Sequence, residues 1–293
     1  MEYADRIRNL NTLIAEQRLI RNNWEYTDDD GRQYACLLAA LSPEAAKGKS
    51  ASECPASVMP GWLAYLTPVI DDEGSFEEWP NVVRRYANLA QRWHALTEEQ
   101  WNRAALRIQG ELIKIVHPMV SDEVSGVGSE FLQLVNRVLE GNPQTTSPEV
   151  WEPLHKTVLK RIKTLKQMWI TVSNELQDLR KQARMERLAG NQGTAHSMIT
   201  LRQQQLLSVE MDTEFLRAIQ FLTDRTPSTR WFEPRQSSPQ DFKILKACRA
   251  LSGAVLLSQQ QKGPNNRGEL AWDRIIDCIL NGLETTIKSA ESK

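Results

Sequence analysis

Four histidines are the residues best suited to bind a metal ion or to transfer protons. They stand at positions 94, 117, 155 and 196, and no two of them have the spacing of a metal-binding helix motif such as HExxH. A catalytic zinc ion needs three converging protein ligands, and no local motif supplies two, so the sequence predicts no metal site. His94 follows Trp93 on an amphipathic segment and His155 lies near Trp151, so we predict a structural role for both.

The cysteines and serines are the candidate nucleophiles. Four cysteines, at positions 36, 54, 248 and 278, stand alone in apolar surroundings without CxxC spacing, and the sequence contains no GxSxG motif. A cysteine in an apolar context usually behaves as a small buried hydrophobic residue. Four cysteines would allow two disulfides, but a chain of this length does not need them, so we expect reduced thiols. The sequence therefore predicts no catalytic residue and no cofactor.

Two short segments combine residue types that often bind ions. Ser125–Glu130 (SGVGSE) places glycines ahead of a predicted helix, an arrangement that can bind anions. No strand pattern precedes this segment and no Gly-Lys-Ser/Thr follows it, so we predict a flexible turn. The acids of Asp71–Glu73 and Glu77–Glu78 are suited to acid–base chemistry or metal binding. Acids also gather at helix starts because of the helix dipole, and we predict this capping role.

The strongest chemical asymmetry of the chain is its distribution of charge. Residues 156–187 contain nine basic and three acidic side chains, a net charge of +6, whereas residues 1–104 contain eleven basic and sixteen acidic ones, a net charge of -5. A basic helix face can bind an acidic protein surface or a nucleic-acid backbone, or it can simply keep a long helix solvated. The residues predicted to contact a partner are Lys160, Arg161, Lys163, Lys166, Arg180, Lys181 and Arg184.

These basic residues lie on a segment with the apolar spacing of a long helix. Steps of three and four residues connect apolar positions from Val158 to Ala183, a spacing typical of a coiled-coil heptad. A glycine-rich break at 190–193 and a second helical pattern to about Thr223 predict an antiparallel helical hairpin. The seam predicted to be buried consists of Leu165, Trp169, Val172, Leu176 and Leu179.

Helical patterns on both sides of this hairpin predict an all-α fold. Capping-box patterns open helices at Ser75 and Thr97. At most one short β-hairpin is expected, around the Asp-Gly turn near residues 24–36. Polar connections at 141–148 and 226–239 divide the chain. We predict an N-terminal helical domain over 1–141 with 268–293 packed on it, a projecting hairpin over 147–225, and C-terminal helices over 226–293.

The chain as a whole has the composition of a water-soluble globular protein. Of its 293 residues, 25% are charged and 41% hydrophobic, and 36 basic and 37 acidic groups give a net charge of -1. A net charge near zero excludes binding to nucleic acid by overall charge alone. The N-terminal segment carries charges where an export signal needs an apolar core, and the longest late apolar run is interrupted by lysine and arginine. We therefore expect a cytoplasmic protein without membrane contact.

The chain also resembles a group of small helical proteins encoded in bacterial and phage genomes. The segments that carry the resemblance are ACLLAALSPEA, CPASVMPGWLAYLTPVIDDEGS, WPNVVRRYANLAQRWHALTEEQW and WDRIIDCILNGLETTI. They cover about residues 1–105 and 270–288. The resemblance implies a helical fold, packing of the two chain ends against each other, and an origin near mobile genetic elements. It transfers no activity and no functional residue.

These patterns together predict a non-enzymatic cytoplasmic protein-interaction module that acts through the hairpin. We expect a protein partner, and a homodimer is one form that this interaction can take. The resemblance favours an inhibitor or accessory factor of phage or mobile-element origin. The first alternative is a nucleic-acid-binding protein that uses the basic helix over 156–187. The second alternative is an enzyme whose site converges from distant helices.

Overall fold

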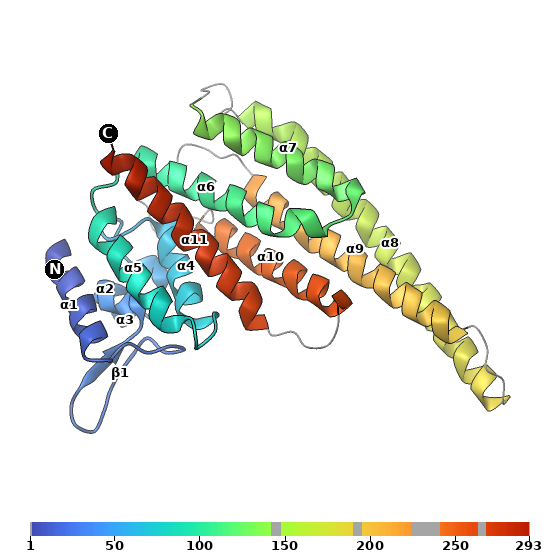
Figure 1. The fold of residues 1–293 in the computed structure, drawn as a ribbon, viewed down its shortest axis with the longest axis horizontal. Coiled ribbons are helices and arrows are strands. Elements are labelled where there is room, and N and C mark those ends of the chain that lie inside the picture. Colours follow the sequence, from blue (N-terminus) through green and yellow to red (C-terminus); the bar gives the residue numbers. More distant parts are fainter. Residues whose placement is uncertain (1, 142–147, 190–194, 224–240, 263–267, 293) are drawn as a thin grey trace.

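The structure, a computed structural model, describes residues 2–141, 148–189, 195–223, 241–262 and 268–292 (Figure 1). Eleven α-helices and one two-stranded antiparallel sheet within these residues confirm the all-α class. The predicted connection at 226–239, all but the two end residues of the one at 141–148, and the predicted turn at 190–193 lie outside the described residues.

Helices follow one another along the chain, interrupted near the N-terminus by one β-hairpin. The first seven α-helices are α1 (Tyr3–Ala15), α2 (Leu37–Leu41), α3 (Pro43–Gly48), α4 (Gly61–Asp72), α5 (Trp79–Trp93), α6 (Glu98–Val116) and α7 (Asp122–Leu139). The last four are α8 (Pro148–Leu188), α9 (Ala195–Thr223), α10 (Asp241–Lys262) and α11 (Gly268–Glu291). The strands are β1 (Glu25–Thr27) and β2 (Gln33–Ala35), and the short 3-10 helices are η1 (Ala51–Glu53) and η2 (His117–Met119).

The expected β-hairpin is confirmed. Strands β1 and β2 pair antiparallel, with Tyr26 opposite Tyr34. The turn between them closes through Gly31, whose backbone N–H donates to the Asp28 carbonyl oxygen at 3.0 Å. Gly31 has a φ of 79°, a conformation that glycine adopts without steric cost, so the Asp-Gly pattern reports the turn correctly.

Two predicted helix starts illustrate how local sequence fixes the elements. At Thr97 the capping box is complete, because the Thr97 hydroxyl accepts from the Gln100 N–H and the Gln100 side chain accepts from the Thr97 N–H. The pattern at Ser75 is less complete, since the Ser75 hydroxyl accepts from Glu78 N–H at 3.4 Å but α5 begins only at Trp79. Pro80 favours this later start, because its fixed φ and missing N–H suit the first turn of a helix.

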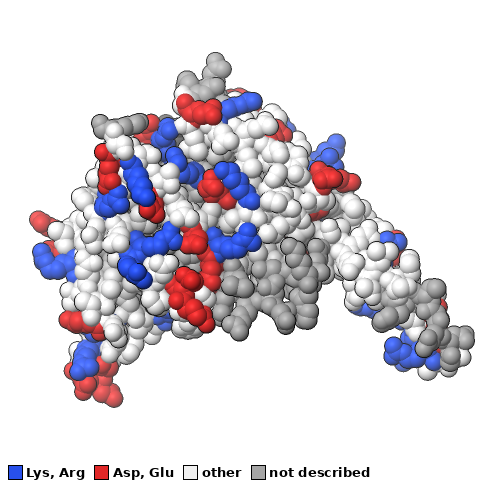
Figure 2. All heavy atoms as spheres, in the orientation of Figure 1, with Lys and Arg blue, Asp and Glu red and all other residues white. Residues whose placement is uncertain are grey.

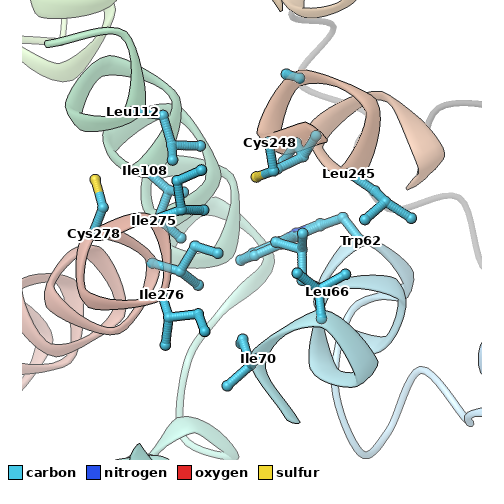
Figure 3. Close-up of a cluster of buried hydrophobic side chains, with 14 of the residues drawn as sticks. Trp62, Leu66, Ile70, Ile108, Leu112, Leu245, Cys248, Ile275, Ile276 and Cys278 are labelled. Carbon is cyan, nitrogen blue, oxygen red and sulfur yellow. The ribbon is translucent and has the colours of Figure 1, made fainter. Parts of the chain in front are cut away.

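The core lies where four helices from distant parts of the chain meet. Figure 3 shows apolar side chains of α4, α6, α10 and α11 pointing toward one another, among them Trp62, Ile108, Leu245 and Ile275. Helix α11 packs against α6 and α5, so the C-terminal helix closes the body formed by the N-terminal part (Figure 1). Polar contacts reinforce this packing: the Ser75 N–H donates to Asp273 at 2.8 Å.

The segment Ser125–Glu130 is helical, so the predicted flexible turn is wrong. It lies inside α7, which begins at Asp122. One of its two glycines serves close packing: a Cβ added at Gly128 would lie 2.6 Å from the His117 ring and 2.7 Å from the Phe215 ring, whereas a Cβ added at Gly126 would meet no atom within 4 Å. The N-terminus of α7 is held from another helix, because Asp212 accepts hydrogen bonds from the Ser121 N–H at 3.0 Å and the Ser121 hydroxyl at 2.6 Å.

The acids of Asp71–Glu73 do not open a helix, which corrects the prediction for them. Asp71 and Asp72 are the last residues of α4. Asp71 is 1% exposed, and its Oδ2 accepts from the Leu37 N–H at 3.1 Å, so it caps α2 rather than the helix that follows it. Burial and the neighbouring Asp72 raise the pKa of the Asp71 carboxyl well above its ordinary value, whereas Arg21 and hydrogen bonds from Leu37 and Cys36 oppose this shift.

Replacing Asp71 by asparagine should stabilise the protein more at pH 7 than at pH 4. The unfolded carboxyl ionises near pH 4, and the folded one ionises at higher pH. The stability contributed by a group with a raised folded pKa is complete below the unfolded pKa and is lost as the pH rises through the folded pKa. Asparagine keeps the oxygen acceptor for Leu37 without this loss. Urea unfolding at the two pH values measures the difference, and an equal effect at both would contradict it.

Candidate interaction surface

Helices α8 and α9 form an antiparallel pair. Three contacts between them define the register: His155 Nδ1 lies 3.0 Å from Thr223 Oγ1, the Trp169 indole N–H donates to Glu210 at 2.8 Å, and Arg202 Nε lies 2.9 Å from a Glu175 oxygen. Along these contacts the residue numbers rise on α8 and fall on α9, so the two helices run in opposite directions. With 41 residues, α8 is about 60 Å long and projects with α9 beyond the body (Figure 1).

The pair is anchored to the body at one end only. In the first turns of α8, Trp151, Leu154 and Val158 are buried, and the Trp151 ring packs edge-on against Phe131 at 5.8 Å. On α9, one face is buried toward the body, where α10 packs along it. Among the described helices, only α9 contacts the distal half of α8 to a large extent, and most side chains of this half are exposed.

The seam of α8 agrees with the heptad prediction at three positions and differs at two. Leu165, Val172 and Leu176 are buried, as predicted. Leu179 is only half-buried, and Trp169 is 40% exposed, so its predicted burial is wrong. The indole N–H explains the exposure of Trp169: a buried indole needs a hydrogen-bond acceptor, and its acceptor here, Glu210, lies on the solvent-accessible edge of the pair.

The seven basic residues predicted to contact a partner are all exposed on α8. Lys181 pairs with Asp178 at 2.8 Å, whereas the other six form no ion pair with any described residue. They fall into two clusters along the helix, which we call the proximal cluster (Lys160, Arg161, Lys163 and Lys166) and the distal cluster (Arg180, Lys181, Arg184 and the neighbouring Arg187). The proximal cluster spreads around the open side of the helix. In the distal cluster, Arg180, Arg184 and Arg187 follow one stripe at i, i+4 and i+7, and Lys181 lies beside it.

An uncharged window separates the two basic clusters. Residues 167–174 (QMWITVSN) carry no charge, and Met168, Trp169 and Ile170 are all exposed there. Beside them runs an open groove of about 280 Å³ between the two helices. Its lining consists of Thr164, Gln167, Met168, Thr171, Val172, Glu175, Arg202 and Gln205.

Sequence reasoning missed Met168 and Ile170. A signal for them exists, because three consecutive apolar residues on one helix cannot all lie on the same seam. If Trp169 occupies the seam position, its two neighbours are turned about 100° to either side. The run Met168-Trp169-Ile170 therefore indicates apolar side chains outside the seam.

Reactive side chains that the structure describes outside the α8–α9 pair have structural roles in this fold. His117 Nε2 lies 3.0 Å from the Ser125 carbonyl oxygen and 3.1 Å from the Ser129 hydroxyl, which ties η2 to α7. His94 packs on the Tyr3 ring at 5.0 Å. The four cysteines are free, and burial raises the pKa of the Cys36 and Cys278 thiols to about 12, so they are not activated nucleophiles.

The described part of the chain contains no group of three or more histidine, cysteine, aspartate or glutamate side chains arranged to hold a metal ion. None of its helices combines the length and apolarity needed to cross a membrane. In comparisons with known proteins, no family model, curated protein or solved structure matches the chain.

Proposed function

We propose that the chain is a cytoplasmic, non-enzymatic interaction protein that binds an acidic protein surface through the α8–α9 pair. One observation carries the proposal. Ten large apolar side chains of the described residues are exposed, and eight of them lie on α8 and α9, beside two clusters of basic groups. Exposed apolar side chains concentrated on one projecting element are typical of a protein-binding site.

The window between the clusters favours a protein over a nucleic acid as the partner. A phosphate backbone attracts the basic side chains but gains little from Met168 and Ile170. A protein surface with an apolar centre and an acidic rim would bury these two side chains and pair with the proximal cluster beside them. The groove beside Met168 offers space for an apolar side chain of such a partner.

The resemblance to small helical proteins of bacterial and phage genomes supports a more specific role. We propose an inhibitor or accessory factor of mobile-element origin, because a binding surface on a projecting hairpin is sufficient for either role.

The test compares how well three variants capture protein partners from cells. The binding of a captured partner to each variant is then measured with purified proteins. K160E/R161E/K163E reverses the proximal cluster, and M168S/I170S removes the apolar window. The matched control R84E/R249E/R274E reverses three exposed arginines on α5, α10 and α11. We expect the first two variants to weaken binding at least about tenfold, and the control to bind as the wild type does. All three should fold, since surface substitutions usually change stability by about ±0.5 kcal/mol.

Two results would contradict the proposal. If the first two variants bind as the wild type does, the exposed basic and apolar side chains of α8 only contact solvent. Loss of binding after nuclease treatment, with affinity for a short DNA duplex that falls steeply with salt, would identify a nucleic acid as the partner. In that case, each phosphate contact removed by reversal should lower the salt slope by about one unit.

A further inference from the structure

The free end of α8 combines basic and apolar side chains that no described element covers. Residues 180–188 hold the distal cluster and one glutamate, a net charge of +3. Between these charges, Met185 is 67% exposed and Leu188 is 75% exposed, the largest value among the exposed large apolar side chains of the described residues. An end of a helix that exposes such side chains is suited to bind an apolar surface that carries negative charge.

A surface of the opposite character lies on the β1–β2 hairpin. Tyr26 is 44% exposed and stacks face to face on Tyr34, with 4.6 Å between the ring centroids. Residues 25–34 hold four acidic side chains and one arginine, a net charge of -3. The Asp28 carboxylate shapes the turn by accepting the backbone N–H groups of Asp30 and Arg32.

Two acidic side chains of this hairpin remain available for a partner. Glu25 and Asp29 are exposed and form no ion pair with any described residue. Asp30 approaches Arg32 only to 3.9 Å, a weak contact between two exposed groups. Figure 2 shows acidic side chains at this end of the molecule and basic ones at the tip of the α8–α9 pair.

The two surfaces match in charge and in side-chain chemistry. Net charges of +3 and -3 attract each other, and an arginine guanidinium binds favourably over a tyrosine ring. A methionine thioether also packs well against an aromatic ring, so Arg184 and Met185 are suited to the stacked pair of Tyr26 and Tyr34. The surfaces lie at opposite ends of the longest axis of the molecule (Figure 1), so one chain cannot bring its own two surfaces together.

We propose that the distal cluster of one copy binds the β1–β2 hairpin of a second copy, and that the chain forms an antiparallel dimer. Each copy carries both surfaces at opposite ends, so two copies related by a two-fold axis form two equivalent contacts and close the assembly. This inference rests on the proposed function, because both use α8 as a binding surface. It adds that the partner of the distal end of α8 is a second copy of the chain.

Charge exchange between the two surfaces tests the proposal. R180E/R184E/R187E reverses the helix end, and E25K/D29K/D30K reverses the hairpin while Asp28 keeps its turn. By sedimentation velocity at low salt, we expect the wild type to have twice the chain mass of 33.5 kDa, and each variant alone to have the mass of a single chain. An equimolar mixture of the two variants should regain the dimer. In one of its two contacts the acidic helix end of the first variant meets the basic hairpin of the second, and in the other contact both surfaces are wild-type. Increasing salt should dissociate the dimer.

A wild-type chain that stays monomeric at every concentration, or variants that associate as the wild type does, would overturn the proposal. Absence of a dimer in the mixture would overturn it as well, even if each variant alone were monomeric. R84E/R249E/R274E controls for the change in net charge and should remain dimeric. The proximal variant K160E/R161E/K163E should also remain dimeric, so a failed dimer and a failed capture of an acidic partner are distinguished by different variants.

Discussion

Replacing Trp93 by alanine should lower the free energy of unfolding by about 3–5 kcal/mol, the range for large aromatic side chains removed from a core. Trp93 is fully buried, and its ring packs against Tyr86 at 5.3 Å and Trp101 at 6.1 Å. Its indole N–H also donates to the Val58 carbonyl oxygen at 3.1 Å, so the substitution leaves a buried acceptor without its donor. Urea unfolding of the purified variant measures the loss.

Trp169→Ala is the matched control, because it makes the same chemical change at an exposed site. It should lower the free energy of unfolding by only about 1 kcal/mol, because the main loss is one hydrogen bond, from Trp169 to Glu210. If Trp93→Ala unfolds the protein completely, Trp93→Phe gives a milder comparison that keeps an aromatic ring and loses the hydrogen bond. Equal costs for Trp93→Ala and Trp169→Ala would contradict the packing described for α5.

The features predicted correctly from the sequence are those whose partners lie close along the chain. The capping box of Thr97 and Gln100 spans one helical turn, and the β1–β2 turn is closed within four residues. Apolar periodicity likewise reports one face of a helix, which is why Leu165, Val172 and Leu176 are recognisable as buried positions.

The incorrect predictions concern residues whose partners are distant in sequence. Asp71 caps a helix 34 residues earlier, and Trp169 bonds to a glutamate 41 residues later. Gly128 packs against a phenylalanine of α9. No local pattern records such contacts, because only the tertiary fold brings the two groups together.

The candidate surface was predictable in its charge but not in its apolar part. Basic residues away from a seam must face solvent or a partner, so their exposure follows from the heptad alone. Whether Met168 and Ile170 are covered depends on which helices surround α8. Only the structure shows that, among the described helices, α9 is the principal neighbour of its distal half.

Replacing Leu176 by alanine should lower the free energy of unfolding by about 2–5 kcal/mol, the range for a buried leucine. Leu176 is buried in the distal part of α8, where α9 is its principal neighbour. Leu188→Ala is the control on the same helix, because it makes the same chemical change at a side chain that is 75% exposed, and it should change the free energy of unfolding by no more than about ±0.5 kcal/mol.

The position of Leu176 determines how its loss should be measured. The distal α8–α9 pair can open without unfolding the core, because no other described helix covers it to a comparable extent. Part of the loss in stability should therefore appear as local opening. Amide hydrogen exchange over residues 165–185 should therefore accelerate in Leu176→Ala and not in Leu188→Ala. If opening and global unfolding are coupled, the midpoint of thermal unfolding should fall by at least about 3 °C. If exchange and midpoint both match the wild type, Leu176 does not hold the two helices together, and the α8–α9 pair must owe its stability to its anchored end.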